Sequence, residues 1–282
     1  MALQDYLAPR VSDELRREEE SHEREIQWFL TSWLPRSLAA VKNGLDECMA
    51  LLAPDESASS TLALSSPRSE AFKGYVVRRG ASILKGEIQI RTSGGLLRGE
   101  AFQFSVDPAR PLELPQIADV VDMLVLANSM LSFFAQPLDG SQCGEALRVV
   151  DTILSHVRGA VSLLQSANGV RLFPHSLAQK ESFVPALPAN VALDLSIKEA
   201  AVFADFRLLE VIRSDLLGIF NRGKEDEETY AWGEERVRVR ERIRVEAQDP
   251  ALMAILSKLL SVENSLELTH TQMDVLQMDK ES

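Results

Sequence analysis

Apolar residues along the chain follow a heptad spacing in four segments, and each of these segments predicts a helix. The first segment runs from Ser12 to Leu52. Steps that alternate between three and four residues keep apolar side chains on one side of a helix. Pro35 lies inside this run and is expected to kink the helix. The apolar positions of the first segment are Leu34, Leu38, Val41, Leu45, Cys48 and Leu52.

Three later segments repeat this spacing. Pro111 and Pro115 precede the second, a break at residues 137–140 precedes the third, and Asp249–Pro250 opens the fourth. An aspartate followed by proline is typical of an N-cap and the first helical position. The apolar series are Ile117, Val121, Leu124, Asn128, Leu131 and Phe134, then Leu147, Val150, Leu154, Val157, Val161 and Leu164, and last Leu252, Ile255, Leu259, Val262, Leu266, Thr269, Met273 and Leu276.

Two other regions alternate with a period of two, which predicts strands. Residues 73–106 are expected to form a three-stranded meander with a turn at 93–95. Residues 191–197 and 237–245 alternate as well, whereas 199–209 suit either a strand or a helix and 210–230 are ambiguous. Residues 53–69 are rich in serine and proline and are expected to form a flexible loop.

The order helix, strands, helix, helix, strands, helix predicts an α+β fold. Because no single helix can bury its apolar side alone, we expect an antiparallel four-helix bundle. The topology puts both strand regions at the same end, where they are expected to pair into one β-sheet module in an elongated, two-lobed protein. The predicted domains are a helical bundle (12–52, 113–168 and 248–278) and a β domain (70–107 and 170–247). A leucine zipper that dimerises the chain is the alternative, but each series spans only three to four heptads.

Composition narrows the function classes. The 282 residues include 30 basic and 42 acidic side chains, for a net charge of −12. This charge repels nucleic acids and anionic membranes unless a basic patch exists locally. Two cysteines without a CxxC motif exclude a disulfide scaffold and a zinc ribbon. The most apolar window, 123–127, is interrupted by Asp122 and Asn128, so no spanning helix or targeting segment is expected, and cytosolic residence is the default.

No catalytic, cofactor-binding or metal-binding motif is expected to function in this chain. His22–Glu23 begins a zinc-protease motif, but Ile26 stands where the second histidine is needed. The segment 80–86 contains glycines and a lysine in the wrong order for a phosphate-binding loop. The four histidines are isolated in the sequence, which disfavours a metal site. We therefore expect a protein that is not an enzyme.

The sharpest local feature is a run of alternate arginines, Arg236, Arg238, Arg240, Arg242 and Arg244. On a regular strand these side chains share one face and form a possible interaction stripe for a phosphoinositide, a nucleic acid or an acidic partner. The alternative is a solvated sheet face whose charges are neutralised by nearby glutamates or cross-strand acids.

Three places in the sequence resemble the Rogdi family, the smaller subunit of the RAVE complex. The first is the opening helix at 25–30 (EIQWFL), and the second is 183–188 (FVPALP) with the strand that follows it. The third is Trp232–Gly233 followed by the arginine–valine strand and the leucine-rich last helix. The resemblance runs over nearly the whole chain and includes no catalytic motif.

The resemblance implies a helical bundle with an attached β domain. It also implies a non-enzymatic adaptor, without a cofactor, that promotes assembly of the peripheral sector of the vacuolar-type proton ATPase onto its membrane sector. The implied partners are a large WD-repeat scaffold and peripheral pump subunits, and no nucleic acid is expected. The implied protein is cytoplasmic, a monomer on its own, and recruited to vacuolar or endosomal membranes through its partners. The alternative is a phospholipid- or nucleic-acid-binding module that uses the arginine strand 236–244.

Overall fold

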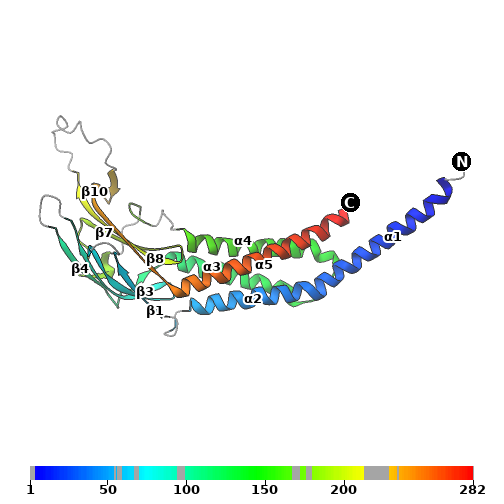
Figure 1. Ribbon diagram of the computed structural model, residues 1–282, viewed down its shortest axis with the longest axis horizontal. Coiled ribbons are helices and arrows are strands. Elements are labelled where there is room, and N and C mark those ends of the chain that lie inside the picture. The colour runs from blue at the N-terminus through cyan, green and yellow to red at the C-terminus, as the bar shows by residue number, and fades with distance from the viewer. Residues whose placement is uncertain are drawn as a thin grey trace, which may run out of the picture. The chain divides into compact units, whose positions relative to one another are not determined.

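The structure is a computed structural model that describes residues 4–53, 55, 59–66, 70–93, 99–166, 172–175, 180–212, 229–233 and 235–281. Most of the turn expected at 93–95 and of the ambiguous stretch 210–230 lies outside these residues. The helical elements are α1 (Gln4–Trp28), η1 (Phe29–Trp33), α2 (Leu34–Leu51), α3 (Pro115–Met130), η3 (Leu131–Ala135), η4 (Gly140–Gln142), α4 (Cys143–Gln165), η6 (Lys180–Ser182) and α5 (Pro250–Glu281) (Figure 1).

The chain folds as two compact units. Unit 1 contains Met1–Met49, Asp122–Ala160 and Ser257–Ser282, and unit 2 contains Ala50–Val121 and Val161–Leu256. The boundaries between the units fall inside α2, α3, α4 and α5, and not at helix ends. Each unit is therefore assembled from segments that are far apart in the sequence. The predicted domain division, with boundaries at helix ends, stays a prediction.

The predicted apolar series identify most of the buried helix positions. All six expected positions from Leu34 to Leu52 are buried, and so are those of α5 from Leu252 to Met273. In α3 the buried series includes Val120 and Ala127, one position before the predicted Val121 and Asn128. Asn128 is half-buried and donates a hydrogen bond of 3.2 Å to Asp46 of α2.

The interruption expected at Pro35 is a π-helical turn that ends just before this proline. The backbone N–H of Leu34 donates to the carbonyl oxygen of Phe29, five residues earlier. Pro35 has no N–H, so regular α-helical pairing cannot continue through it. The extra residue of a π turn re-aims the side chains on either side of it, and here it stacks the rings of Phe29 and Trp33 with centroids 4.9 Å apart.

The first sheet is antiparallel and six-stranded. It contains β1 (Ser59–Ser65), β2 (Phe72–Arg79), β3 (Ser82–Arg91), β4 (Ala101–Val106), β5 (Leu112–Glu113) and β6 (Phe183–Val184). The order is β1-β2-β3-β4-β6, and β5 pairs with β3. The loop expected at 53–69 therefore contains a strand. Leu62 and Leu64 of β1 face the core and are buried, while the serines around them supply the polar positions of the alternation.

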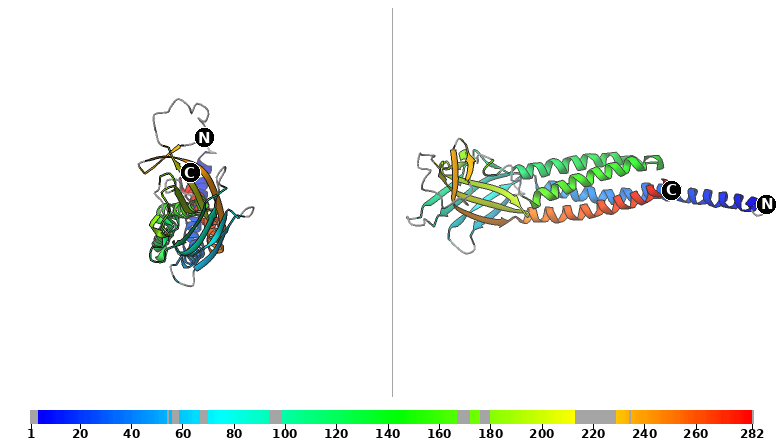
Figure 2. Two further views of the ribbon diagram at one scale, coloured as in Figure 1. Left: turned by 90° about the vertical axis from the view of Figure 1, so that its left-hand side faces the viewer. Right: turned by 90° about the horizontal axis from the view of Figure 1, so that it is seen from above.

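The second sheet is antiparallel and four-stranded, in the order β7-β8-β10-β9. Its strands are β7 (Val191–Lys198), β8 (Ala201–Val211), β9 (Thr229–Trp232) and β10 (Glu235–Gln248). Residues 199–209, which suited either a strand or a helix, belong mostly to β8. Glu199 and Ala200 turn the chain with positive φ angles of 51° and 55°, as a two-residue hairpin requires. The rings of Phe102 (β4) and Phe206 (β8) lie 5.6 Å apart, so the two sheets contact each other within unit 2. Figure 2 shows the strands of unit 2 from two further sides.

The predicted fold, a four-helix bundle with one β-sheet module at one end, is wrong. The described residues form two antiparallel sheets with ten strands between them. The two strand regions do not merge into one sheet, because only the short β6 joins strands of the first region. β7 pairs with β8 across a two-residue turn and β10 returns beside β8, so the second region satisfies its own backbone hydrogen bonds. The α+β class is consistent with these separate runs of helices and antiparallel strands.

A buried ion pair fixes the start of α5 in unit 2. The Nε atom of Arg78 (β2) lies 2.5 Å from Oδ2 of Asp249, and both side chains are fully buried. The other carboxylate oxygen of Asp249 accepts hydrogen bonds from the backbone N–H groups of Ala251 and Leu252. The predicted N-cap at Asp249 is therefore confirmed, and it is held by a partner 171 residues earlier in the sequence.

Within the described ranges, one helical stretch has the length and apolar composition needed to cross a membrane, Pro115–Ala135. No such stretch was expected, because Asp122 and Asn128 interrupt it. Ile117, Val120 and Leu124 line its fully buried side. A helix packed into a protein core has the same length and composition.

Candidate interaction surface

The candidate surface is the arginine strand, β10. Its register against β8 places Arg238 opposite Glu210, Arg242 opposite Arg207 and Arg244 opposite Asp205. Between Val239 and Glu241 the register shifts by one residue, so Arg240 is an extra residue without a partner on β8. Such a β-bulge changes which face the following side chains occupy.

The expectation that the five arginines share one face is therefore wrong. Successive residues of β8 point to opposite faces. Glu210, opposite Arg238, lies on one face, while Arg207 and Asp205, opposite Arg242 and Arg244, lie on the other. The sequence continues to alternate through the bulge, so the change of face leaves no trace in the pattern of arginines and valines.

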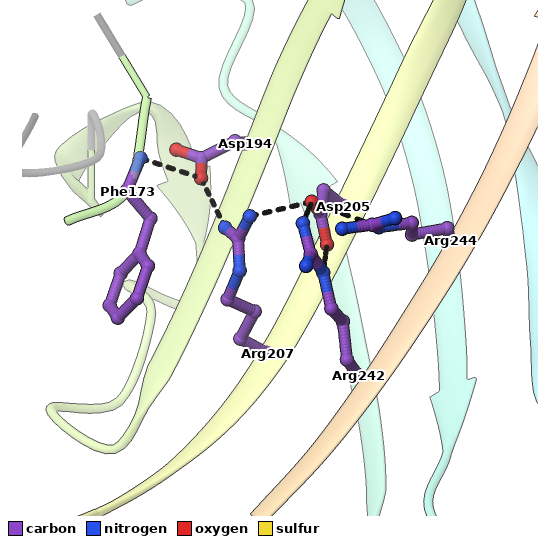
Figure 3. Close-up of polar contacts among 6 residues, drawn as sticks. All are labelled: Phe173, Asp194, Asp205, Arg207, Arg242 and Arg244. Carbon is purple, nitrogen blue, oxygen red and sulfur yellow. Dashed lines mark hydrogen bonds and ion pairs between the residues drawn. The ribbon is translucent and has the colours of Figure 1, made fainter. Parts of the chain in front are cut away.

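Asp205 gathers the two arginines after the bulge into an ion-pair network (Figure 3). Nε of Arg242 donates to Oδ1 of Asp205 at 2.8 Å, and a second Arg242 nitrogen contacts Oδ2. Nε of Arg244 lies 3.4 Å from the same Oδ2. Arg207, on the same strand as Asp205, donates to it at 2.6 Å. One carboxylate thus meets three guanidinium groups, and its side chain is only 10% exposed.

Asp194 of β7 supplies the second carboxylate of the network. Its Oδ2 accepts from Arg207 at 2.7 Å and from the backbone N–H of Phe173 at 3.2 Å. Burial raises the pKa of Asp194, and these two donors oppose that shift. The guanidinium of Arg207 also lies 4.7 Å from the centre of the Phe173 ring, a cation–π distance.

An apolar cluster continues the same face of the second sheet. It consists of Phe173, Ala192, Leu209, Trp232 and Val237, with Tyr230 and Val239 packed against it. The bulge is what turns Val237 and Val239 toward this cluster, because Val237 pairs with Val211 and Val239 with Leu209. The bulge therefore lets Val237 and Val239 pack in the apolar cluster, and as a consequence it places the arginines on two different faces of the sheet.

Among the described residues, two arginines of the strand take no part in an ion pair. Arg238 pairs with Glu210 at 2.8 Å, and Arg242 and Arg244 pair with Asp205. Arg236 and Arg240 are exposed, and among the described residues no acidic side chain forms an ion pair with either. The neutralised sheet face, with cross-strand acids as partners, thus accounts for three of the five arginines.

Sequence reasoning missed Asp194, Asp205 and Arg207. All three are buried charges within apolar strands, in the segments VALDLSIK and AVFADFRLLEV. A charged residue in an otherwise apolar strand is nearly always paired, because an unpaired buried charge is very costly. That signal predicts a buried ion pair, but it cannot tell which arginines of β10 complete it.

The histidines do not form a metal site in the described part of the chain. No group of three or more histidine, cysteine, aspartate or glutamate side chains there could hold a metal ion. Nε2 of His270 lies 3.8 Å from Oδ1 of Asp151 in unit 1, which is a single long contact. Cys48 and Cys143 are both buried free thiols.

Comparison with known proteins places the chain in the family that its sequence resembles. A relative from Schizosaccharomyces pombe, "Regulator of V-ATPase in vacuolar membrane protein 2", is 23% identical over 270 residues, which cover 86% of this chain and 90% of that protein. The family described as "Rogdi leucine zipper containing protein" matches residues 25–217 and 219–274. This match includes α2, α3, α4, most of α5, both sheets and the arginine strand, and the chain belongs to that family.

Proposed function

We propose that this protein is a non-enzymatic adaptor subunit of a RAVE-like complex. In this role it promotes assembly of the peripheral sector of the vacuolar-type proton ATPase onto its membrane sector. Its partners are a large WD-repeat scaffold and peripheral pump subunits. It resides in the cytoplasm and reaches vacuolar or endosomal membranes through those partners.

The observation that carries the proposal is the relative whose name states regulation of V-ATPase, because its similarity covers 86% of this chain. The architecture is compatible with an adaptor. Each compact unit exposes side chains that its own packing does not use, such as Arg236 and Arg240 in unit 2 and Trp28 in unit 1. The buried charges of the second sheet are paired with one another, which is typical of structural networks.

The experiment removes the protein from the cells that carry it and follows the peripheral pump subunits. Membranes and cytosol are separated, and ATP-dependent proton uptake is measured on the membranes. We expect peripheral subunits to accumulate in the cytosol and proton uptake to fall several-fold, while the total amount of each subunit stays the same. Unchanged distribution and uptake would contradict the proposal.

A pull-down of the tagged chain from its own cytosol identifies the partners. Recovery of a very large WD-repeat protein together with peripheral pump subunits is expected. Recovery of the pump subunits without such a scaffold would agree with a role in regulating the pump. It would contradict the adaptor complex proposed here.

The two exposed arginines support a second candidate, a module that binds phospholipid headgroups or nucleic acid through β10. The double variant Arg236→Glu with Arg240→Glu tests it, and Arg238→Glu is the control because Arg238 already pairs with Glu210. If this function exists, the double variant loses binding to anionic vesicles or to DNA, and binding of the original protein falls steeply with salt. No binding at physiological salt would exclude it.

A further inference from the structure

Unit 1 contains an apolar groove that no side chain of the described residues fills. It has a volume of about 380 Å³ and lies between the α1–η1 segment and the last turns of α5. Trp28, Phe29 and Trp33 line one side, and Gln272, Val275 and Leu276 line the other. The groove lies entirely within one compact unit.

The walls of this groove expose unusually large apolar side chains. Trp28 is 59% exposed and Val275 is 54% exposed. Outside the lining, Leu268 lies seven residues before Val275 on the same side of α5 and is 55% exposed. The stacked rings of Phe29 and Trp33 stiffen the opposite wall. Exposed apolar side chains that line a concavity mark a binding site more often than scattered ones do.

Gln272 and Glu25 add polar groups to the lining. Glu25 is exposed and offers its carboxylate to an occupant. The Oε1 atom of Gln272 is buried, so an occupant of the groove does not reach it.

The surroundings of the groove are acidic. Between Glu14 and Glu25, α1 carries six glutamates and three arginines, a balance of −3, and all of these side chains are exposed. Asp274 of α5 is exposed as well. This charge attracts basic segments and repels both an anionic lipid surface and a second copy of the same acidic face.

The shape of the groove selects a helix as its occupant. Both walls are helices, so neither offers a strand edge with free backbone groups. A segment that enters must satisfy its own backbone hydrogen bonds, which a helix does. Leu268 and Val275 are separated by two helical turns, or about 10 Å along the axis.

We propose that this groove binds an amphipathic, basic helix of a partner protein. One bulky apolar side chain of that helix inserts between Trp28 and Val275, and its lysines or arginines face Glu25 and the acidic side of α1. The groove has this chemistry whether or not the partner belongs to a proton-pump assembly.

The test uses two synthetic helical peptides and the full-length protein. The peptides share one apolar face of leucine and phenylalanine, and their polar faces carry lysine in one and glutamate in the other. Titration calorimetry measures binding, and the fluorescence of the exposed Trp28 reports occupancy. We expect saturable, salt-sensitive binding of the lysine peptide and at least tenfold weaker binding of the glutamate peptide.

Three variants assign the binding to the groove. Trp28→Ala and Val275→Ser remove exposed apolar contacts and are each expected to weaken binding about tenfold or more. Glu25→Lys is expected to weaken binding of the lysine peptide and to strengthen binding of the glutamate peptide. Leu126→Ser is the matched control, because Leu126 is an exposed apolar residue (50%) elsewhere on unit 1, and it should leave binding unchanged.

Several outcomes would overturn the proposal. These are no binding of the lysine peptide, equal binding of both peptides, and binding that survives the loss of Trp28. Sedimentation of the protein alone decides the remaining case: a dimer that Val275→Ser dissociates would mean that a second copy occupies the groove.

Discussion

Arg78 is the largest side chain that is fully buried in the described residues, and its charge depends on a single carboxylate. Asp249 pairs with it and also caps α5. Removing one partner of a buried pair leaves the other charge without compensation in an apolar environment, whereas replacing both by apolar groups can be nearly neutral. The pair therefore adds little net stability, but it fixes the start of α5 against β2.

We predict that Arg78→Met lowers the free energy of unfolding by about 3–5 kcal/mol. Asp249→Asn should have a similar cost, and the double variant should recover part of the loss. Urea denaturation measures these values. Lys42→Ala is the control, because Lys42 forms an exposed pair with Asp46 on α2 and should change stability by less than about 0.5 kcal/mol. Strictly additive effects of Arg78→Met and Asp249→Asn would refute the coupling.

Cys48 is a thiol that burial keeps protonated. Desolvation raises its pKa from 9.0 to about 11, although the nearby Lys258 acts in the opposite direction. Only the thiolate reacts with disulfide reagents, so Cys48 is predicted to be inert in the folded protein and reactive after unfolding. A thiol-reactive chromophore at neutral pH, with and without urea, measures this. Rapid labelling of Cys48 in the folded state would contradict the prediction.

The same shift has a consequence for stability at alkaline pH. The unfolded thiol ionises near 9.0 and the folded one near 11, so the folded state holds its proton more tightly. Stability is therefore unaffected by this group below about pH 9 and declines as the pH rises toward 11. Cys48→Ala should remove that component of the decline, which is measurable by denaturation at several pH values.

At the scale of elements, the β-bulge at Arg240 decides which face of β10 packs. We predict that deleting Arg240 moves Val237 and Val239 away from the Phe173–Trp232 cluster and lowers the melting temperature by several degrees. Arg240→Ala keeps the extra residue and should be nearly neutral, because the Arg240 side chain is exposed. A crystal structure or amide exchange of β9 and β10 would locate the damage. Equal stability of the two variants would mean that the bulge is dispensable.

Elements were predictable where a single periodicity controls burial. The apolar series of α2 and α5 identify buried residues because a helix with one buried side must repeat near 3.6 residues. The strands around Ile88 and Phe104 alternate for the corresponding reason, whereas β7 around Leu193 is buried on both faces. β1 was missed because its serines resemble a loop, although Leu62 and Leu64 alternate.

The arrangement of the strands was not predictable from these patterns. An alternation of apolar and polar residues indicates that a strand has one buried face, but it does not indicate which strand lies beside it. The arginine strand shows this most clearly, because an inserted residue switches faces while the letters continue to alternate. The Asp205 network was unpredictable for the same reason, since its members come from β7, β8 and β10 with a register that only the folded sheet fixes.

At the scale of the whole molecule, neither compact unit is a continuous segment. Unit 1 needs the part of α5 after Leu256, where Val262 packs against Gly44 and Thr269 hydrogen-bonds to Ser37 at 2.9 Å. Unit 2 contains the start of α5 and its Asp249 cap. The same helix therefore supplies buried residues to both units.

We predict that a fragment ending at Leu256 loses unit 1 and keeps much of unit 2. Without Leu259, Val262 and Leu266, the apolar sides of α2 and α4 lose a major packing partner and those helices should unfold. Hydrogen exchange should show rapid exchange in α2 and α4 with retained protection in β3 and β8. A fragment ending at Gln277 is the control and should behave like the full chain. Protection of α2 in the shorter fragment would contradict the prediction.

The position of α5 also determines when folding can finish during synthesis. The ribosome makes α2 about 200 residues before α5, which at roughly 5–20 residues per second leaves its apolar side without this partner for about 10–40 s. During that interval Leu34, Leu38 and Leu45 are available to anything that binds apolar helices. A chaperone that acts on nascent chains should therefore contact the first helical segment, and release it only after the last has emerged.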